Sequence, residues 1–167
     1  MKRKTKNNKN SFTDTTSFND INDNSLFSVL QNLPVAVIIY SSTRLLFLNK
    51  KAIKLLKITK TQEKTMSGHS VLDFIPTQYH KLVKSANKSI LAGQEPDSLE
   101  LKIKNIAGEI TDVEFKSNTI TLNGKTVIQT VITDISARIN SQDQLIEVEN
   151  NLQVILRGID EVVYYVD

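Results

Sequence analysis

The stretch LELKIKNIAGEITDVEFKSNTITLNGKTVIQTVITD, residues 99–134, carries the clearest fold signal in the chain. In its first segment apolar residues alternate with charged ones, as in a strand with one face on a core and the other in water. IAGE at 106–109 reads as a turn, and Asn123-Gly124 is the strongest short hairpin signal in the sequence. We therefore expect three consecutive antiparallel strands joined by tight turns.

The chain before this stretch predicts two further strands and several helices. Residues 26–33 have apolar side chains at helical spacing, and VAVIIY at 35–40 suits a strand buried on both faces. RLLFLN at 44–49 reads as a second strand, Asn49 as a helix N-cap, and residues 77–93 as an amphipathic helix. This order predicts an α+β fold, with a five-stranded antiparallel sheet and helices on one face.

Composition limits the classes of protein to which the chain can belong. It has 167 residues, enough for one ordinary domain with extensions, and no cysteine. A disulfide framework, a zinc–cysteine site, an iron–sulfur cluster and a thiol nucleophile are therefore excluded. No apolar run of membrane-spanning length and no export signal occurs, so we expect a cytoplasmic protein without a membrane span.

The net charge of +3 is concentrated in a short N-terminal tail. Five of the 21 basic residues fall within residues 1–10, and the rest of the chain carries 16 basic against 18 acidic side chains. We interpret residues 1–24 as a disordered basic and polar tail. Nucleic acid is accordingly disfavoured as a partner of the folded part.

After Asp134 the chain is predicted to be helical, and residues 136–158 form a linker helix of coiled-coil type. Its apolar residues follow the 3-4-3-4 spacing of a dimer seam, at Leu145, Val148, Leu152, Ile155 and Ile159. This spacing favours a parallel homodimer, although two heptads also suit a helix that packs within one chain. SQDQ at 141–144 has capping-box form, so the helix either continues from the junction or restarts there.

An internal repeat is found when residues 26–41 are placed over residues 152–167. Both segments read as an apolar helix, a break and a strand, and leucines coincide at two positions. We infer that residues 152–167 are the truncated start of a second copy of the same domain.

The element order and several short motifs together resemble a PAS domain over residues 25–135. The first helix and strand match at LQNLPVAVIIY (30–40), and the family's Asn-x-x-Ala junction matches at LNKKA (48–52). FIP precedes the long helix, NIAGE replaces the usual Asp-Gly turn, and VITDIS (131–136) matches the Asp-Ile-Thr terminus. YSSTR departs from the family by lacking the usual Asp and Gly between the first two strands.

The resemblance implies a sensory and dimerising input module of a multidomain signal-transduction protein, with a sensor histidine kinase of a two-component system as the leading candidate. In the family an aspartate and a hydroxyl anchor the strand-to-helix junction, and a following basic residue can pair with the aspartate; here these are Asp134, Ser136 and Arg138. A ligand- or interface-driven change would pass through this junction to the C-terminal helix. N-capping of that helix by Asp134 or Ser136 is the competing way to set its angle. The alternative function is a PAS-containing transcription regulator or adaptor that mediates only protein–protein contact.

Nine side chains should face the space between sheet and helices when the alternation is read in the PAS register: Ile38, Tyr40, Leu101, Ile103, Val113, Phe115, Ile128, Thr130 and Ile132. Of these, Tyr40 and Thr130 alone are polar. A mostly apolar lining with few polar groups suits a small apolar ligand, and it suits a filled core better still.

The sequence leaves the identity of any cofactor open. A flavin of the LOV type is excluded because its photochemistry needs a cysteine, and haem is disfavoured because His80 lies three residues before the position that matches the family's haem ligand, Val83. Two isolated histidines do not make a metal site. No triad or phosphate-binding loop occurs, so no catalytic residue is predicted in this portion, although the complete protein is a candidate histidine kinase.

Overall fold

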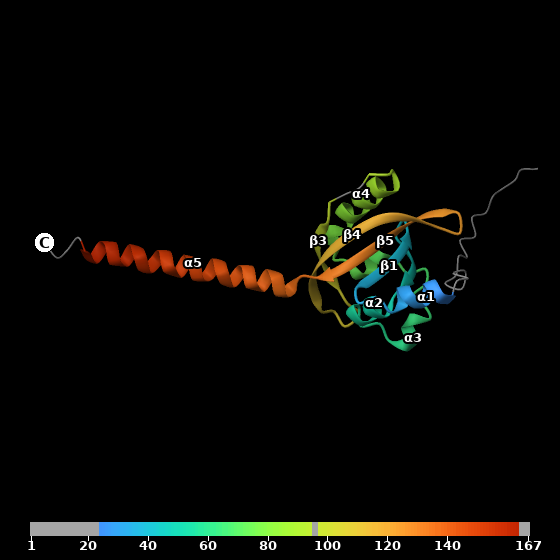
Figure 1. Ribbon diagram of the computed structural model, residues 1–167, viewed down its shortest axis with the longest axis horizontal. Coiled ribbons are helices and arrows are strands. Elements are labelled where there is room, and N and C mark those ends of the chain that lie inside the picture. The colour runs from blue at the N-terminus through green and yellow to red at the C-terminus, as the bar shows by residue number, and fades with distance from the viewer. Residues whose placement is uncertain (1–23, 95–96, 164–167) are drawn as a thin grey trace, which may run out of the picture.

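The computed structural model of the chain describes residues 24–94 and 97–163 (Figure 1). Almost all of the predicted tail, residues 1–24, lies outside this range. The described part consists of one α+β domain and a long helix that projects from it.

Five antiparallel strands form one sheet, in the order β2-β1-β5-β4-β3. Their bounds are Ala36–Ser41 for β1, Arg44–Leu48 for β2, Leu99–Lys104 for β3, Ile110–Leu122 for β4 and Lys125–Asp134 for β5. The last strand in sequence is thus the central strand of the sheet. A displacement of β5 would therefore change its hydrogen bonding with both neighbouring strands, β1 and β4.

The hairpin between β4 and β5 forms where the sequence predicts it. Asn123 and Gly124 both have positive φ, 49° and 73°, as a two-residue turn with the twist of the flanking strands requires. The register that follows pairs Phe115 with Ile132 and Ser117 with Thr130. This register therefore places inward apolar residues of the two strands opposite each other, and inward polar residues likewise.

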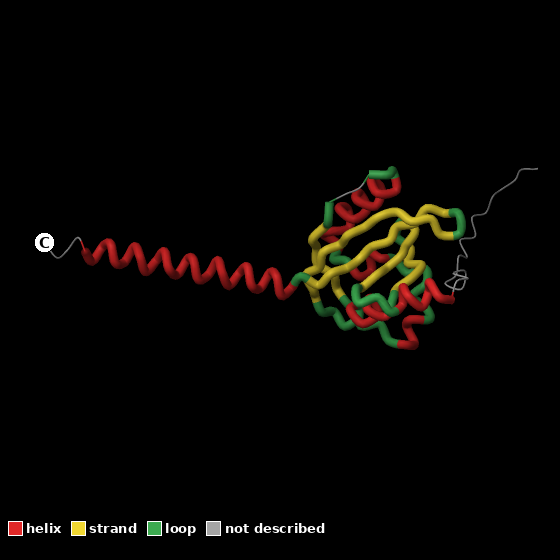
Figure 2. The backbone as a smooth tube through the Cα atoms, viewed as in Figure 1, coloured by secondary structure: helices red, strands yellow, loops and turns green. Residues whose placement is uncertain are grey.

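The segment between β2 and β3 supplies the helices of the inner face (Figure 2). They are α2 (Lys50–Leu55), α3 (Lys60–Glu63), the 3₁₀ helices η2 (Val71–Phe74) and η3 (Thr77–Tyr79), and α4 (His80–Leu91). Apolar residues of α2, η2 and α4 pack with the inner face of the sheet in one large core. The predicted helix 77–93 thus starts as a 3₁₀ turn and continues as α4.

A second, smaller apolar cluster lies on the other face of the sheet. Ile39, Phe47 and Val127 form it, and helix α1 (Asn24–Gln31) covers it with Phe27 and Leu30. The rings of Phe27 and Phe47 meet edge to face, with centroids 5.7 Å apart. Because α1 covers this face, β1 is buried on both sides, as its continuous apolar run predicts.

Asn49 ties the first helix to the sheet and to α2. Its buried side chain accepts hydrogen bonds from the backbone N–H of Val37 (3.0 Å) and Ala52 (2.9 Å), the second being the N-cap bond of α2. Its amide nitrogen donates to the carbonyls of Val35 (2.8 Å) and Leu30 (3.3 Å). One side chain therefore sets the relative positions of α1, β1 and α2.

Helix α5 (Ser136–Val163) extends away from the domain for 28 residues (Figures 1 and 2). It passes through Ser141 without interruption, so the alternative of a restart at SQDQ is wrong. It also remains helical as far as Val163, and residues 164–167, the end of the predicted second copy, lie outside the described range. Among the described residues no helix combines the length and the apolar character that a membrane span requires.

Candidate functional site

The nine side chains predicted to face inward are all buried, and all but Thr130 belong to the inner core. Four of them, Ile38, Ile103, Phe115 and Ile132, border a void of only about 10 Å³. A water molecule occupies about 30 Å³ of liquid, so this part of the interior is closely packed. The residues predicted as a ligand lining are here neighbours in a filled core.

The two polar members of that set meet in a buried hydrogen-bonded chain. The hydroxyl of Thr130 donates to the Tyr40 hydroxyl (3.2 Å), which donates to Oδ1 of Asn87 on α4 (3.0 Å). Ser117 Oγ lies 2.7 Å from Thr130 Oγ1, and Asn87 Nδ2 donates to the carbonyl of Ser42 (2.9 Å). This polar cluster, Tyr40, Asn87, Ser117 and Thr130, links β1, β4 and β5 to α4.

Burial controls the ionisation of the Tyr40 hydroxyl in this cluster. The surroundings raise the pKa of the Tyr40 hydroxyl above its ordinary value of 10.0, because burial disfavours the phenolate. Hydrogen bonds between the Tyr40 hydroxyl and Thr130, Ser117 and Asn87 lower the pKa, but burial outweighs them. The Tyr40 hydroxyl is therefore neutral at physiological pH and is available as a donor.

A cavity of about 90 Å³ adjoins the polar cluster. The polar residues of its wall are Tyr40, Asn87, Asp97 and Ser117, and the apolar ones include Val83, Ile90, Leu99 and Phe115. Its volume corresponds to about three water molecules. The cavity can therefore hold water or a very small polar molecule in contact with a network that includes the central strand.

Sequence reasoning missed Asn87 and Ser117. Asn87 is buried on the face of α4 that also carries Val83 and Ile90, so the helical spacing from those two residues could have indicated it. Ser117 follows Val113 and Phe115 at a spacing of two, which could have indicated its inward position. Neither was predicted, because Asn87 and Ser117 are polar residues outside the apolar runs from which the inward positions were inferred.

The strand-to-helix junction lies at the far end of β5. Ile135 is buried, and its backbone N–H donates to the carbonyl of Asp112 on β4 (3.0 Å). Oδ1 of Asp134 accepts from the backbone N–H of Ser136, the first residue of α5, at 2.9 Å. Asp134 lies one residue before the N-cap position, Ile135, and its side chain accepts the N–H of the first helical residue, which joins the helix to the strand.

Arg138 pairs with a different acidic residue from the one that the resemblance implies. Its guanidinium donates to Oε1 of Glu100 on β3 at 2.8 Å, and Glu100 raises the pKa of Arg138. Glu100 lies directly opposite Glu114 on β4, so the arginine relieves repulsion between two adjacent carboxylates. The first turn of α5 is therefore bound to β5 by Asp134 and to β3 by Arg138.

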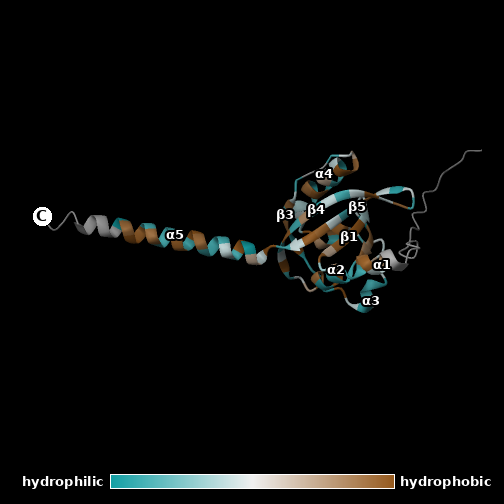
Figure 3. Cartoon of the chain, in the orientation of Figure 1, coloured by the Kyte–Doolittle hydropathy of each residue, from teal (hydrophilic) through white to brown (hydrophobic). Residues whose placement is uncertain are grey.

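The predicted seam of α5 is exposed. Leu145, Val148, Leu152 and Ile155 are each more than half accessible, and apolar residues recur along the coloured part of the projecting helix (Figure 3). The side chain of the fifth seam residue, Ile159, lies outside the described residues. Within the described part of the chain, no element of the domain covers this stripe.

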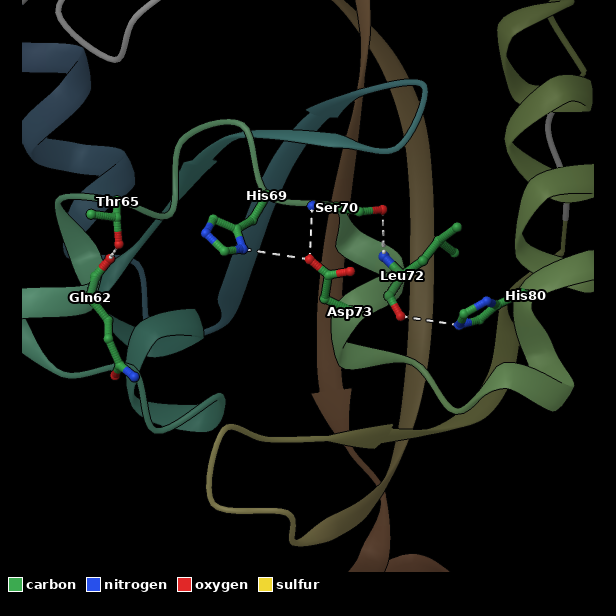
Figure 4. Close-up of polar contacts among 7 residues, drawn as sticks. All are labelled: Gln62, Thr65, His69, Ser70, Leu72, Asp73 and His80. Atoms are coloured by element: carbon green, nitrogen blue, oxygen red, sulfur yellow. Dashed lines mark hydrogen bonds and ion pairs between the residues drawn. The ribbon is translucent and has the colours of Figure 1, made fainter.

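The two histidines lie on opposite sides of η2, and both have structural contacts with this segment (Figure 4). Nε2 of His80 lies 2.7 Å from the carbonyl of Ile75 and 3.1 Å from that of Leu72, so it donates to both and holds the end of η2. Nδ1 of His69 lies 3.5 Å from Oδ2 of Asp73, which also accepts from the backbone N–H of Ser70 (3.2 Å). Among residues 24–94 and 97–163 no group of three potential metal ligands occurs.

No protein-family model matches the chain, and no curated protein matches it in sequence. Solved structures do match. The PAS domain of an HTR-like protein from Haloarcula marismortui has a TM-score of 0.57 at 16% identity, and covers 66% of this chain and 89% of its own. A PAS domain from a two-component sensor histidine kinase has a TM-score of 0.55 at 9% identity, with coverages of 66% and 93%. The fold is therefore the PAS fold, and the predicted resemblance is confirmed at that level.

Proteins of the LOV class are also among the similar structures. An RNA-binding light-oxygen-voltage receptor has a TM-score of 0.61 at 15% identity, covering 75% of this chain and 36% of its own. The Rhodobacter sphaeroides LOV protein has a TM-score of 0.55 at 11% identity, with coverages of 65% and 64%. The exclusion of a LOV-type flavin is therefore wrong, because it rested on one residue type while the fold is shared with LOV proteins.

Proposed function

We propose that this chain is the sensory and dimerising PAS input module of a multidomain signal-transduction protein, with α5 as both its dimer helix and its output. The observation that carries the proposal is the uncovered apolar stripe on a helix that leaves an otherwise complete domain. The likeness to PAS domains of sensor histidine kinases supports the same class of host protein.

The exposed apolar stripe of α5 favours dimerisation. The seam residues repeat at the spacing that two parallel helices bury as knobs into holes. A contiguous apolar surface of this kind on a soluble protein usually marks an interaction site. The strands and the inner helices already form a filled core, so a second α5 is the partner that the spacing favours.

The signal in this proposal begins in the sheet and leaves through the junction. A change at the 90 Å³ cavity alters the polar cluster, of which Thr130 lies on the central strand β5. Four residues further along the same strand, Asp134 accepts the N–H of Ser136 at the start of α5. Displacement of β5 is thereby converted into a change in the direction or packing of the helix pair.

A cysteine scan of α5 tests the dimer, because the natural chain contains no cysteine that could interfere. Single cysteines at Leu145, Val148, Leu152 and Ile155 should form intermolecular disulfides rapidly under mild oxidation. Matched cysteines at the exposed positions Asp143, Asn150 and Arg157, on the opposite side of a heptad seam, should react much more slowly. Cross-linking is measured on non-reducing gels, alongside the molar mass of the natural chain by light scattering.

Equal rates at both sets of positions would show that the helices do not meet along this seam. A chain that remains monomeric at concentrations of tens of micromolar or more would likewise overturn the dimer proposal. Cross-linking only at the outward set would assign the interface to the other side of α5.

A further inference from the structure

A groove on the surface of the domain separates α1 from α2 and α3, which lie close together in Figure 1. It consists of two overlapping hollows: the main hollow, defined as the one that Leu48 borders, of about 470 Å³, and a second hollow of about 570 Å³. Phe27, Gln31 and Ile53 border both. The size lies within the range of small-molecule sites in proteins, about 300 to 1,000 Å³.

The groove has an apolar floor. Leu48 is buried at its base, and the half-buried Phe27 and Ile53 form its walls. The edge-to-face contact with Phe47 holds the Phe27 ring, and the Asn49 hydrogen bonds fix the end of α1 relative to α2. The floor is thus a prearranged apolar surface that can receive a hydrocarbon chain or ring.

The rim of the groove is basic. Lys60 and Lys64 on and beside α3 border the main hollow and Lys50 borders the second, against one carboxylate, Glu63. Lys50 donates to Oδ1 of Asn32 (2.8 Å). Lys60 and Lys64 have no side-chain hydrogen bond or ion pair within the part of the chain that the structure describes. An anionic group at the rim would therefore meet two ammonium groups that have no competing partner there.

We propose that this groove binds a small amphipathic carboxylate, of the class of medium-chain fatty acids. The apolar chain lies on Phe27, Leu48 and Ile53, and the carboxylate accepts hydrogen bonds from Lys60 and Lys64. Charge complementarity selects this occupant, because the rim carries three lysines and one glutamate. The same charge repels the basic residues 1–10 of the chain itself.

Occupation of the groove has a structural consequence that is separate from dimerisation through α5. The ligand contacts α1 on one side and α2 with α3 on the other, and so it fastens α1 to the rest of the domain. Because α1 covers the outer apolar cluster of the sheet, binding also stabilises that face.

The test uses the full chain and the fluorescent probe 11-(dansylamino)undecanoic acid, whose emission rises in an apolar site. The chain has no tryptophan, so its own fluorescence interferes little. Probe binding should be saturable, and dodecanoate should displace the probe whereas dodecanol should not. The double variant Lys60→Glu/Lys64→Glu should weaken binding by about tenfold or more, the value of one charge-assisted hydrogen bond.

Two variants control for charge. Glu63→Lys should strengthen probe binding, since it removes the one acidic group at the rim. Lys51→Glu/Lys54→Glu makes the same change in net charge at exposed positions of α2 that do not border the groove, and it should leave the affinity unchanged. Thermal melts of each variant confirm that the domain is folded.

Three results would overturn the proposal. One is the absence of saturable binding in the natural chain, and another is displacement of the probe by dodecanol as effectively as by dodecanoate. The third is binding that appears only after Asp14, Asp20 and Asp23 are changed to asparagine, which would assign the groove to the chain's own residues 11–23.

Discussion

Tyr40 and Thr130 are polar residues in an apolar inward pattern, and the structure joins them to Asn87 and Ser117. A buried hydroxyl without a hydrogen-bond partner lowers the free energy of unfolding by roughly 1 to 3 kcal/mol, so each residue of the polar cluster depends on its neighbour in the cluster. Among the described residues no buried side-chain oxygen or nitrogen lacks a hydrogen bond. The cluster therefore specifies how α4 sits on the sheet as well as contributing to stability.

Replacement of Tyr40 by Phe should reveal the ionisation of this hydroxyl. The folded pKa is raised above 10.0, so at high pH the unfolded chain loses the Tyr40 proton first. The natural chain should therefore lose stability above about pH 10, whereas this contribution is constant at lower pH. Urea unfolding at pH 8 and at pH 10.5 measures the effect, and the natural chain should lose more stability between the two than Tyr40→Phe does. Equal losses would show that Tyr40 titrates normally.

Asp134 joins the last strand to the first residue of α5. The change Asp134→Ala removes the acceptor for the Ser136 N–H and should cost about 1 kcal/mol, the net value of one hydrogen bond. Asp134→Asn is the matched control, because its side-chain oxygen can still accept that bond. In a Leu152→Cys background, the alanine variant should change the cross-linking rate and the asparagine variant should not. If the alanine variant unfolds the whole domain, the residue is structural and the transmission hypothesis fails.

At the scale of elements, the first turn of α5 is attached to two strands of the sheet. Asp134 binds it to the central strand, and Arg138 binds it to β3 through Glu100. A helix attached at two points should follow a twist of the sheet between β5 and β3 rather than swing about a single hinge. This double attachment is specific to the tertiary arrangement, since Glu100 lies 38 residues before Arg138.

Loss of the Arg138 contact should loosen the first turn of α5 with little effect on global stability. The pair is exposed, and exposed pairs contribute little because water and salt screen them. Hydrogen exchange at the backbone amides of residues 136–139 should accelerate in Arg138→Ala and in Glu100→Gln, and the double variant should exchange no faster than the single ones. Arg157→Ala, further along the same helix, is the control. Additive effects of the two changes would show that the residues act independently.

At the scale of the whole molecule, the chain consists of a filled domain and a helix whose apolar side is uncovered. The cavities of about 90 and 10 Å³ leave little internal room for a ligand, whereas the surface groove beside α1 is several times larger. A ligand or partner would therefore find more space at the groove beside α1 and along the exposed side of α5 than in the interior of the domain.

The proposed dimer should be separable from the fold. The double change Val148→Glu/Leu152→Glu places like charges along the seam and should convert the dimer to a monomer in light scattering. The melting temperature of the domain should stay within error of the natural value, because these side chains belong to neither apolar cluster of the domain. Asn150→Glu/Gln153→Glu adds the same charge on the outward side and should leave the dimer intact. A variant that remains dimeric with charged seam residues would place the interface elsewhere.

Features of the fold that depend on neighbours in sequence were predictable. The alternation in residues 99–134, the Asn123-Gly124 turn and the helical seam are local patterns, and each corresponds to an element of the structure. The inward positions on the strands were predictable for the same reason, since the side-chain period of a strand is two residues. The sequence by itself thus determined the strands, their inner faces, the turn and the amphipathic C-terminal helix.

The tertiary structure decided which distant side chains meet. Tyr40 bonds Asn87 at a separation of 47 residues and Thr130 at a separation of 90, and Arg138 bonds Glu100 rather than the nearby Asp134. It also decided that α1 covers the outer face and forms one wall of a groove. Such contacts depend on strand order and on how helices pack across the sheet. No local period contains that information, because the contacts come from chain segments brought together only when the whole core closes.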